Sequence, residues 1–139
     1  MCELIIKRLL ASNSSHVQYI DKPLENFPQF ELAMNNANID IIYLDRHRII
    51  NNKIDLFTAM DVAFRFYWHS NYSWNSVLDQ LRDSKYISSN GCLVYYEDAS
   101  GLYKGDRQEF NSLVTYLSHA AGHWFNKNVY FKSLICLPL

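Results

Sequence analysis

Between residues 69 and 83, hydrophobic and polar positions separate onto two sides if the segment forms a helix that begins near Ser73. The apolar positions recur at the i, i+3, i+4 and i+7 spacing of an amphipathic helix: Trp74, Val77, Leu78 and Leu81. On a helical wheel of about 100° per residue, the polar positions lie about 140° from that stripe: Tyr72, Asn75, Asp79 and Asp83. We therefore expect one side to pack on a core and the other to expose two carboxylates, an amide and a phenol.

The same kind of pattern predicts the other elements of the chain. Continuous apolar runs indicate strands buried on both faces over residues 39–44, 92–96 and 129–137, and a shorter run over residues 16–20 indicates an edge strand. Helical spacing is found over residues 24–34, 54–66 and 106–124. Residues 2–10 fit either a strand or a short helix, and residues 97–105 are the longest stretch typical of a loop.

The clearest helix start is at Asp106. Asp106 and Glu109 have the spacing of a capping box, and both acids suit the positive end of a helix dipole. Strands separated by helices pair in parallel through right-handed crossovers. The sequence therefore predicts an α/β fold: a small, mostly parallel sheet of three to four strands, packed by three to four helices, in one domain over residues 1–139.

Composition agrees with a folded chain and excludes some partners. Of 139 residues, 49% are apolar, with 10 Tyr, 8 Phe and 3 Trp, which excludes a disordered protein. Thirteen basic residues nearly balance fourteen acidic ones, so no general attraction to nucleic acid or to a membrane surface is expected. Between Asp55 and Glu109, however, eight acids against five Lys and Arg residues give a net charge of −3.

Cysteine usage and the N-terminal segment indicate the compartment. Cys92 and Cys136 lie in apolar runs, and with Cys2 they form no metal-type spacing, so they are interpreted as small buried side chains in a reducing compartment. The apolar patch at the N-terminus is interrupted by Glu3, Lys7 and Arg8, which fits neither a signal peptide nor a spanning helix. We therefore expect a cytoplasmic protein.

The sequence contains no complete catalytic or metal-binding motif. His119 and His123 have the i, i+4 spacing of two metal ligands on one helix side, but no nearby residue supplies a third ligand or the glutamate of an HExxH motif. Asp79 and Asp83, one helical turn apart, could act as an acid and a base, yet nothing in the sequence supplies a pocket for a substrate. We expect no enzymatic activity, no metal and no cofactor.

From residue 39 onward, the order of these elements resembles the barstar family, small α/β inhibitors of ribonucleases. The most specific match lies in residues 73–81, where Trp74, Asp79 and Leu81 agree with the family pattern. Asn75 stands where the family has its first acid, and Asn71 stands where it has glycine. Further agreement comes from Asp55-Leu56, Ala120-Ala121, Trp124, Phe131 and Leu134. The resemblance covers residues 39–139, so residues 1–38 are interpreted as an N-terminal addition of one more strand and helix.

The resemblance implies that the polar side of the 73–83 helix is a binding surface. In the family, this helix and the loop before it plug the active site of the enzyme, with carboxylates in place of substrate phosphates. Carried onto this chain, with Asp79 as the central charge, the toxin-binding residues are His69, Tyr72, Asn75, Asp79, Asp83 and His119. The family acid of the last helix corresponds to His119, so this surface has fewer carboxylates, which favours a partner other than a barnase-type enzyme.

The resemblance thus predicts a bacterial immunity protein that binds a cognate nuclease toxin, most simply a ribonuclease, in a 1:1 complex. The free protein is expected to be a monomer that contacts neither nucleic acid nor membrane. An alternative from another class is a non-inhibitory interaction module, such as a regulatory subunit or a homodimer, that uses the aromatic residues Phe66, Tyr67 and Trp68. A third is a small enzyme that uses His119 and His123.

Overall fold

The computed structural model describes residues 2–11, 14–66 and 71–139. In chain order its elements are α1 (Cys2–Leu10), β1 (Val17–Ile20), α2 (Phe27–Asn36), β2 (Asp40–Tyr43), α3 (Lys53–Ala63), α4 (Trp74–Leu81), β3 (Cys92–Tyr96), α5 (Ser100–Gly105), α6 (Arg107–Phe125) and β4 (Phe131–Cys136). In the described part of the chain, none of these helices is both long and apolar enough to cross a membrane.

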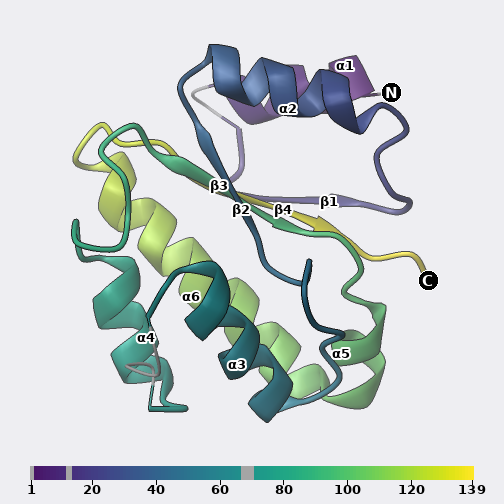
Figure 1. The fold of residues 1–139 in the computed structure, drawn as a ribbon, viewed down its shortest axis with the longest axis vertical. Coiled ribbons are helices and arrows are strands. Elements are labelled where there is room, and N and C mark those ends of the chain that lie inside the picture. Colours follow the sequence, from purple (N-terminus) through teal and green to yellow (C-terminus); the bar gives the residue numbers. More distant parts are fainter. Residues whose placement is uncertain (1, 12–13, 67–70) are drawn as a thin grey trace.

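The four strands form one sheet in the order β1-β4-β3-β2, and every pairing is parallel. Helices α1 and α2 cover one face of this sheet, and α3, α4 and α6 lie on the other (Figure 1). The predicted α/β fold with parallel pairing is therefore confirmed, with six helices in the described residues instead of three to four.

Each face of the sheet has its own core. The core on the side of α3–α6, called the large core below, contains Leu56, Phe57, Val77, Leu81, Val94, Leu113, Leu117, Trp124 and Ile135 among others. The core under α1 and α2, called the small core, consists of Cys2, Leu9, Phe30, Met34, Ile39, Leu93, Tyr95 and Leu134. Alternate residues of β3 point to opposite faces, so a fully apolar strand serves both cores.

Residues 1–38 add one strand and two helices to the sheet, where one strand and one helix were expected. The segment whose period did not decide between strand and helix forms α1, which buries Cys2 and Leu9 and has Glu3 in its first turn. Helix α2 begins later than the apolar spacing suggested. Asn26 caps it by accepting the N–H of Gln29 at 3.2 Å, with proline in the first turn.

The expected loop over residues 97–105 is wrong, because it contains α5. The Asp98 carboxylate accepts hydrogen bonds from the N–H and the hydroxyl of Ser100 at 3.0 and 2.6 Å, at the start of this helix. Gly101 does not mark a loop here. A Cβ atom at this position would lie 2.3 Å from Asn51 Oδ1 and 2.9 Å from the Ile50 carbonyl oxygen, so glycine allows the close approach of that segment.

The expectation that strand 39–44 is covered on both sides is also wrong in part. β2 lies at the edge of the sheet next to β3, with Asp40 exposed and Ile41, Ile42 and Tyr43 half-buried. Its C-terminal end is tied to the neighbouring strand by Asp45, whose carboxylate accepts the N–H groups of Glu97 and Asp98 at 2.9 and 3.0 Å. The expected edge strand at residues 16–20 is confirmed as β1.

Candidate functional site

Two tryptophans fix α4 to α6, one at each end of the helix. At its first residue, Trp74 Nε1 donates to Glu109 Oε2 at 2.8 Å, and the indole ring stacks on Tyr116 with the ring centroids 4.9 Å apart. At its last residue, the Leu81 carbonyl accepts a buried hydrogen bond from Trp124 Nε1 at 2.7 Å. Because both ends are held by directed bonds, the orientation of the helix on the core is fixed.

The predicted apolar stripe of α4 is confirmed. Val77 and Leu81 are buried, and Trp74 and Leu78 are half-buried. Val77 and Leu81 belong to the large core, and Trp74 packs against its edge, with its ring 4.8 Å from that of Phe57. The stripe therefore anchors the helix, as its periodicity indicates.

The contacts of α6 with α4 were only partly expected. The Asp106 carboxylate accepts the N–H of Glu109 at 3.3 Å, which confirms it as the helix cap. The Glu109 carboxylate, however, accepts the hydrogen bond from the indole N–H of Trp74 in α4. Sequence reasoning missed this bond and the role of Trp124, since a tryptophan at helical spacing indicates core packing and gives no sign of a hydrogen-bond partner 43 residues away.

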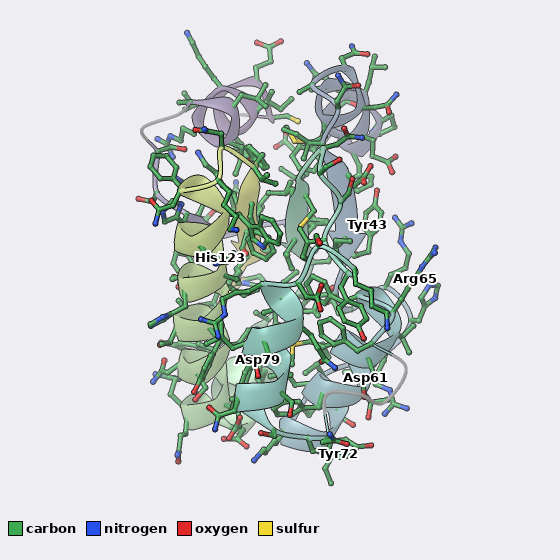
Figure 2. All side chains as sticks on the ribbon, turned by 90° about the vertical axis from the view of Figure 1, so that its left-hand side faces the viewer. Tyr43, Asp61, Arg65, Tyr72, Asp79 and His123 are labelled. Carbon is green, nitrogen blue, oxygen red and sulfur yellow. The ribbon has the colours of Figure 1, made fainter. Side chains whose placement is uncertain are left out.

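The outward side of α4 presents Asn75 and Asp79. Both are exposed, and the side chain of Asp79 retains 76% of its accessible surface. Figure 2 shows Asp79 facing outward from the helix. Arg82, which the sequence reasoning did not single out, places its Nη2 atom 3.0 Å from Asp79 Oδ1. In the free protein the carboxylate is thus partly balanced by an exposed cation of the same helix turn.

The segment before α4 has an unusual backbone. Asn71 and Tyr72 have φ angles of 51° and 50°, in the left-handed region that favours glycine. Asn71 tolerates this conformation better than most residues, which fits its position where the barstar pattern has glycine. Tyr72 remains 45% exposed while its ring edge contacts Phe57 at a centroid distance of 6.2 Å. His69, also predicted for the site, lies outside the described residues.

Asp83 and His119 complete the predicted set, in different surroundings from those expected. Helix α4 ends at Leu81, so Asp83 lies in the following turn and not on the helix, where its Oδ1 atom accepts the N–H of Lys85 at 2.9 Å. His119 is exposed on α6, with its ring 6.4 Å from that of Tyr116, which stacks on Trp74. Asn75 and Asp79 are thus both exposed on α4, whereas Tyr72 lies just before this helix against Phe57 of α3, and His119 lies on α6.

The structure also places residues that the other candidate functions would use. Within the residues that the structure describes, no three His, Cys, Asp or Glu side chains cluster as metal ligands. The three cysteines are buried and unbridged, and burial raises the pKa of the Cys92 thiol to about 12. Phe66, which the interaction-module alternative requires at the surface, is fully buried and stacks on Phe64 at 5.3 Å. Tyr67 and Trp68 lie outside the described residues.

Comparison with known proteins identifies a family for most of the chain. No curated protein and no solved structure matches the chain. A protein-family model, described as barstar (barnase inhibitor), matches residues 39–136, which run from the start of β2 to the end of β4 and include α4 and the loop before it. Since this match spans well over half of the 139 residues, the chain belongs to the barstar family of nuclease inhibitors.

Proposed function

We propose that this protein is a bacterial immunity protein that binds a cognate nuclease toxin, most simply a ribonuclease, and inhibits it in a 1:1 complex. The outward side of α4 and the loop before it cover the active site of the toxin. The protein acts in the cytoplasm and is a monomer when free. The site residues are those predicted above, with Asp79 as the central charge.

The observation that carries this proposal is the exposed Asp79 carboxylate on a helix held at both ends by Trp74 and Trp124. Nuclease active sites hold Arg and Lys side chains for substrate phosphates, and a carboxylate satisfies the same cations through charge-assisted hydrogen bonds. A helix that is already fixed loses little conformational freedom on binding, so more of the interaction energy appears as affinity. Complementary charge also accelerates the encounter.

The ion pair between Asp79 and Arg82 does not obstruct this role. An exposed pair of this kind contributes about 0–1 kcal/mol, so a desolvated cation of the toxin can replace Arg82 at small cost. Arg82 then turns toward solvent from the end of the helix. We expect Arg82→Ala to leave the affinity for the toxin unchanged or to raise it slightly.

The test is co-purification with the toxin encoded immediately upstream, followed by calorimetric titration of wild-type protein and variants. Asp79→Ala should weaken binding by at least about 2 kcal/mol, roughly thirtyfold, as for other interfacial hot spots. Glu97→Ala, which removes another exposed carboxylate at the end of β3, is the matched control and should bind like the wild type. A loss below about 1 kcal/mol for Asp79→Ala would show that the site is elsewhere.

A further inference from the structure

The outer edge of β2 carries main-chain groups that pair with no strand among the described residues. The N–H groups of Asp40 and Leu44 donate to Gly91 and Tyr95 of the β3 side at 3.1 and 3.0 Å. Because successive residues of a strand direct their N–H and C=O groups to opposite sides, those of Ile41 and Tyr43 point away from β3, toward the open edge. An edge of this kind is a template for a further strand.

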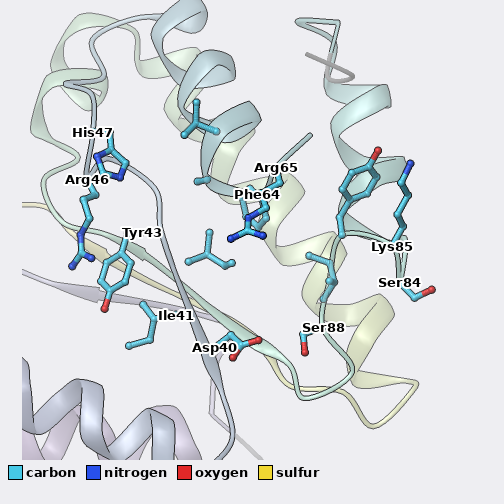
Figure 3. Close-up of a pocket in the computed structure, with 15 residues that line it drawn as sticks. Asp40, Ile41, Tyr43, Arg46, His47, Phe64, Arg65, Ser84, Lys85 and Ser88 are labelled. Atoms are coloured by element: carbon cyan, nitrogen blue, oxygen red, sulfur yellow. The ribbon is translucent and has the colours of Figure 1, made fainter. Parts of the chain in front are cut away.

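This edge opens into a groove of about 860 Å³ (Figure 3). One wall is β2, another is the end of α3 with residues 62–65, and the third is the turn after α4 with residues 84–88. Ile42, Ala63 and Ile87 give the groove apolar lining between these walls. All four residues of β2 line the groove, so an extended backbone can lie along the strand and place its inward side chains on apolar surface.

The groove is rimmed by positive charge. Arg46, Arg65 and Lys85 line it together with His47, against one acid, Asp40. In the described part of the chain, the two ion pairs are Arg48–Asp55 and Arg82–Asp79, so neither involves a cation of the groove. Figure 3 shows Arg65 between β2 and the 84–88 turn, and its φ of 61° is a conformation that an arginine rarely adopts.

We propose that an extended, acidic segment of a partner protein binds in this groove by adding to β2 as a further strand. The main-chain groups of Ile41 and Tyr43 supply the hydrogen bonds, and Arg65 and Lys85 select carboxylates. This mode gives affinity through the backbone and specificity through alternate side chains. The four residues of β2 span roughly 13 Å, enough for about four residues of the partner.

The groove adjoins the proposed toxin-binding surface only at the turn after α4, where Asp83 accepts the N–H of Lys85, and the proposal does not depend on toxin binding. The outward side of α4 offers the carboxylate of Asp79, whereas the groove offers cations and lies to one side of α4, by Tyr43 and Arg65 (Figure 2). A nucleic acid would meet the same cations but would leave the strand edge unpaired. The combination of an open edge, apolar lining and basic rim fits a peptide better.

The probe is the acetylated, amidated peptide TEVEVET, titrated into the full isotope-labelled chain and followed by NMR and amide hydrogen exchange. We expect chemical-shift changes along β2 and, at saturation, exchange of the Ile41 and Tyr43 amides slowed at least tenfold. The counterpart TKVKVKT is the charge control and should bind at least tenfold more weakly. Equal binding of the two peptides, or shifts away from β2, would overturn the proposal.

Charge-reversed variants test the rim. Arg65→Glu combined with Lys85→Glu should weaken TEVEVET at least tenfold, and Lys85→Glu alone at least threefold if the double variant does not fold. Lys22→Glu with Lys127→Glu makes the same change in net charge at exposed positions outside the groove and should bind like the wild type. No binding of TEVEVET at millimolar concentration would overturn the proposal. So would a heptanucleotide that displaces the peptide and protects the same amides.

Discussion

The two faces of the sheet bury residues of the same strands but are covered in different ways. The face that carries the large core is covered by helices of the family region, and its side chains are mainly apolar. The other face is covered by α1 and α2, and this N-terminal part of the chain is held by aromatic rings and by hydrogen bonds to main-chain oxygens. Phe27, for example, stacks on Tyr95 at 5.5 Å.

Side-chain hydrogen bonds hold the N-terminal addition against β4. Tyr130 Oη donates to the Leu9 carbonyl at 2.9 Å, and Lys132 Nζ donates to the Ala11 carbonyl at 2.7 Å and to the Ser14 hydroxyl. Each bond runs from β4 or the residue before it to the segment around α1. The two faces therefore have different roles. The large core holds the helix that carries the candidate site, and the N-terminal addition, residues 1–38, protects the opposite face of the same sheet from solvent.

The largest expected effect is a loss of stability on deletion of the N-terminal addition, residues 1–38. Deletion of residues 1–38 would expose Leu93, Tyr95 and Leu134, which are now at most 2% exposed. At about 1.5–3 kcal/mol for each side chain, the loss approaches the whole stability of a typical domain, about 5–15 kcal/mol. We expect an insoluble or non-cooperative product by circular dichroism and urea unfolding. A soluble, cooperative fragment would show that the addition is dispensable.

A matched pair of substitutions separates the two cores by function. Phe57→Ala in the large core and Phe30→Ala in the small core each remove a fully buried ring, at an expected cost of about 3–5 kcal/mol. Only Phe57 contacts Trp74 and Tyr72, so only its loss should also weaken toxin binding, by about tenfold. Denaturant unfolding and calorimetric titration measure the two effects. Equal loss of binding in both variants would contradict the division between the faces.

A smaller effect is expected at Lys132, a buried cation that holds the addition. Lys132→Met keeps most of the apolar stem and removes the donor to Ala11, at an expected cost of about 1–3 kcal/mol in the free energy of unfolding. Lys127→Met, at an exposed position, should change stability by less than about 0.5 kcal/mol. If both variants unfold at the same denaturant concentration, the bond does not hold the addition in place.

The smallest expected effect is a pH dependence of the free energy of unfolding that comes from His123 of α6. Burial, together with the charges of Lys127 and Arg82, lowers the pKa of His123 below its ordinary value of 6.5. The unfolded chain therefore binds more protons than the folded one in the window just below pH 6.5, so this group makes stability rise as pH rises through that window. His123→Gln should flatten that part of the profile in urea unfolding. An unchanged profile would mean that His123 is not the group responsible.

Local periodicity predicted most of the fold and the position of the candidate site. The stripe of α4, the cap at Asp106 and the buried β3 are confirmed because each depends on neighbours within one or two turns of chain. The family resemblance of residues 73–81 is likewise a local pattern. The match of the barstar family model to residues 39–136 confirms the resemblance. The roles of the individual site residues stay predictions.

What escaped prediction depends on contacts between distant segments. Periodicity carries no information on the order of strands. The strand at residues 39–44 was expected to be covered on both faces, but β2 lies at the edge of the sheet, where its residues are half-buried or exposed. The glycines of α5 indicated a loop, because the close approach of Asn51 that requires them is not visible in the local sequence. The pair between Asp79 and Arg82, in contrast, has the i, i+3 spacing of neighbours on one helix face and could be predicted from the sequence.

The pairing of β1 with β4 has a consequence for biosynthesis. Val17 lies opposite Ser133, so the first strand to be translated joins the sheet only through the last one. While the chain is still being made, α1, β1 and α2 have no β4 to dock on, and contacts of such large sequence separation form slowly. We expect the N-terminal segment to dock last, after residues 131–136 have left the ribosome. Until then β3 lacks its neighbour β4, so the nascent chain exposes apolar residues of β3 and is most in need of chaperones.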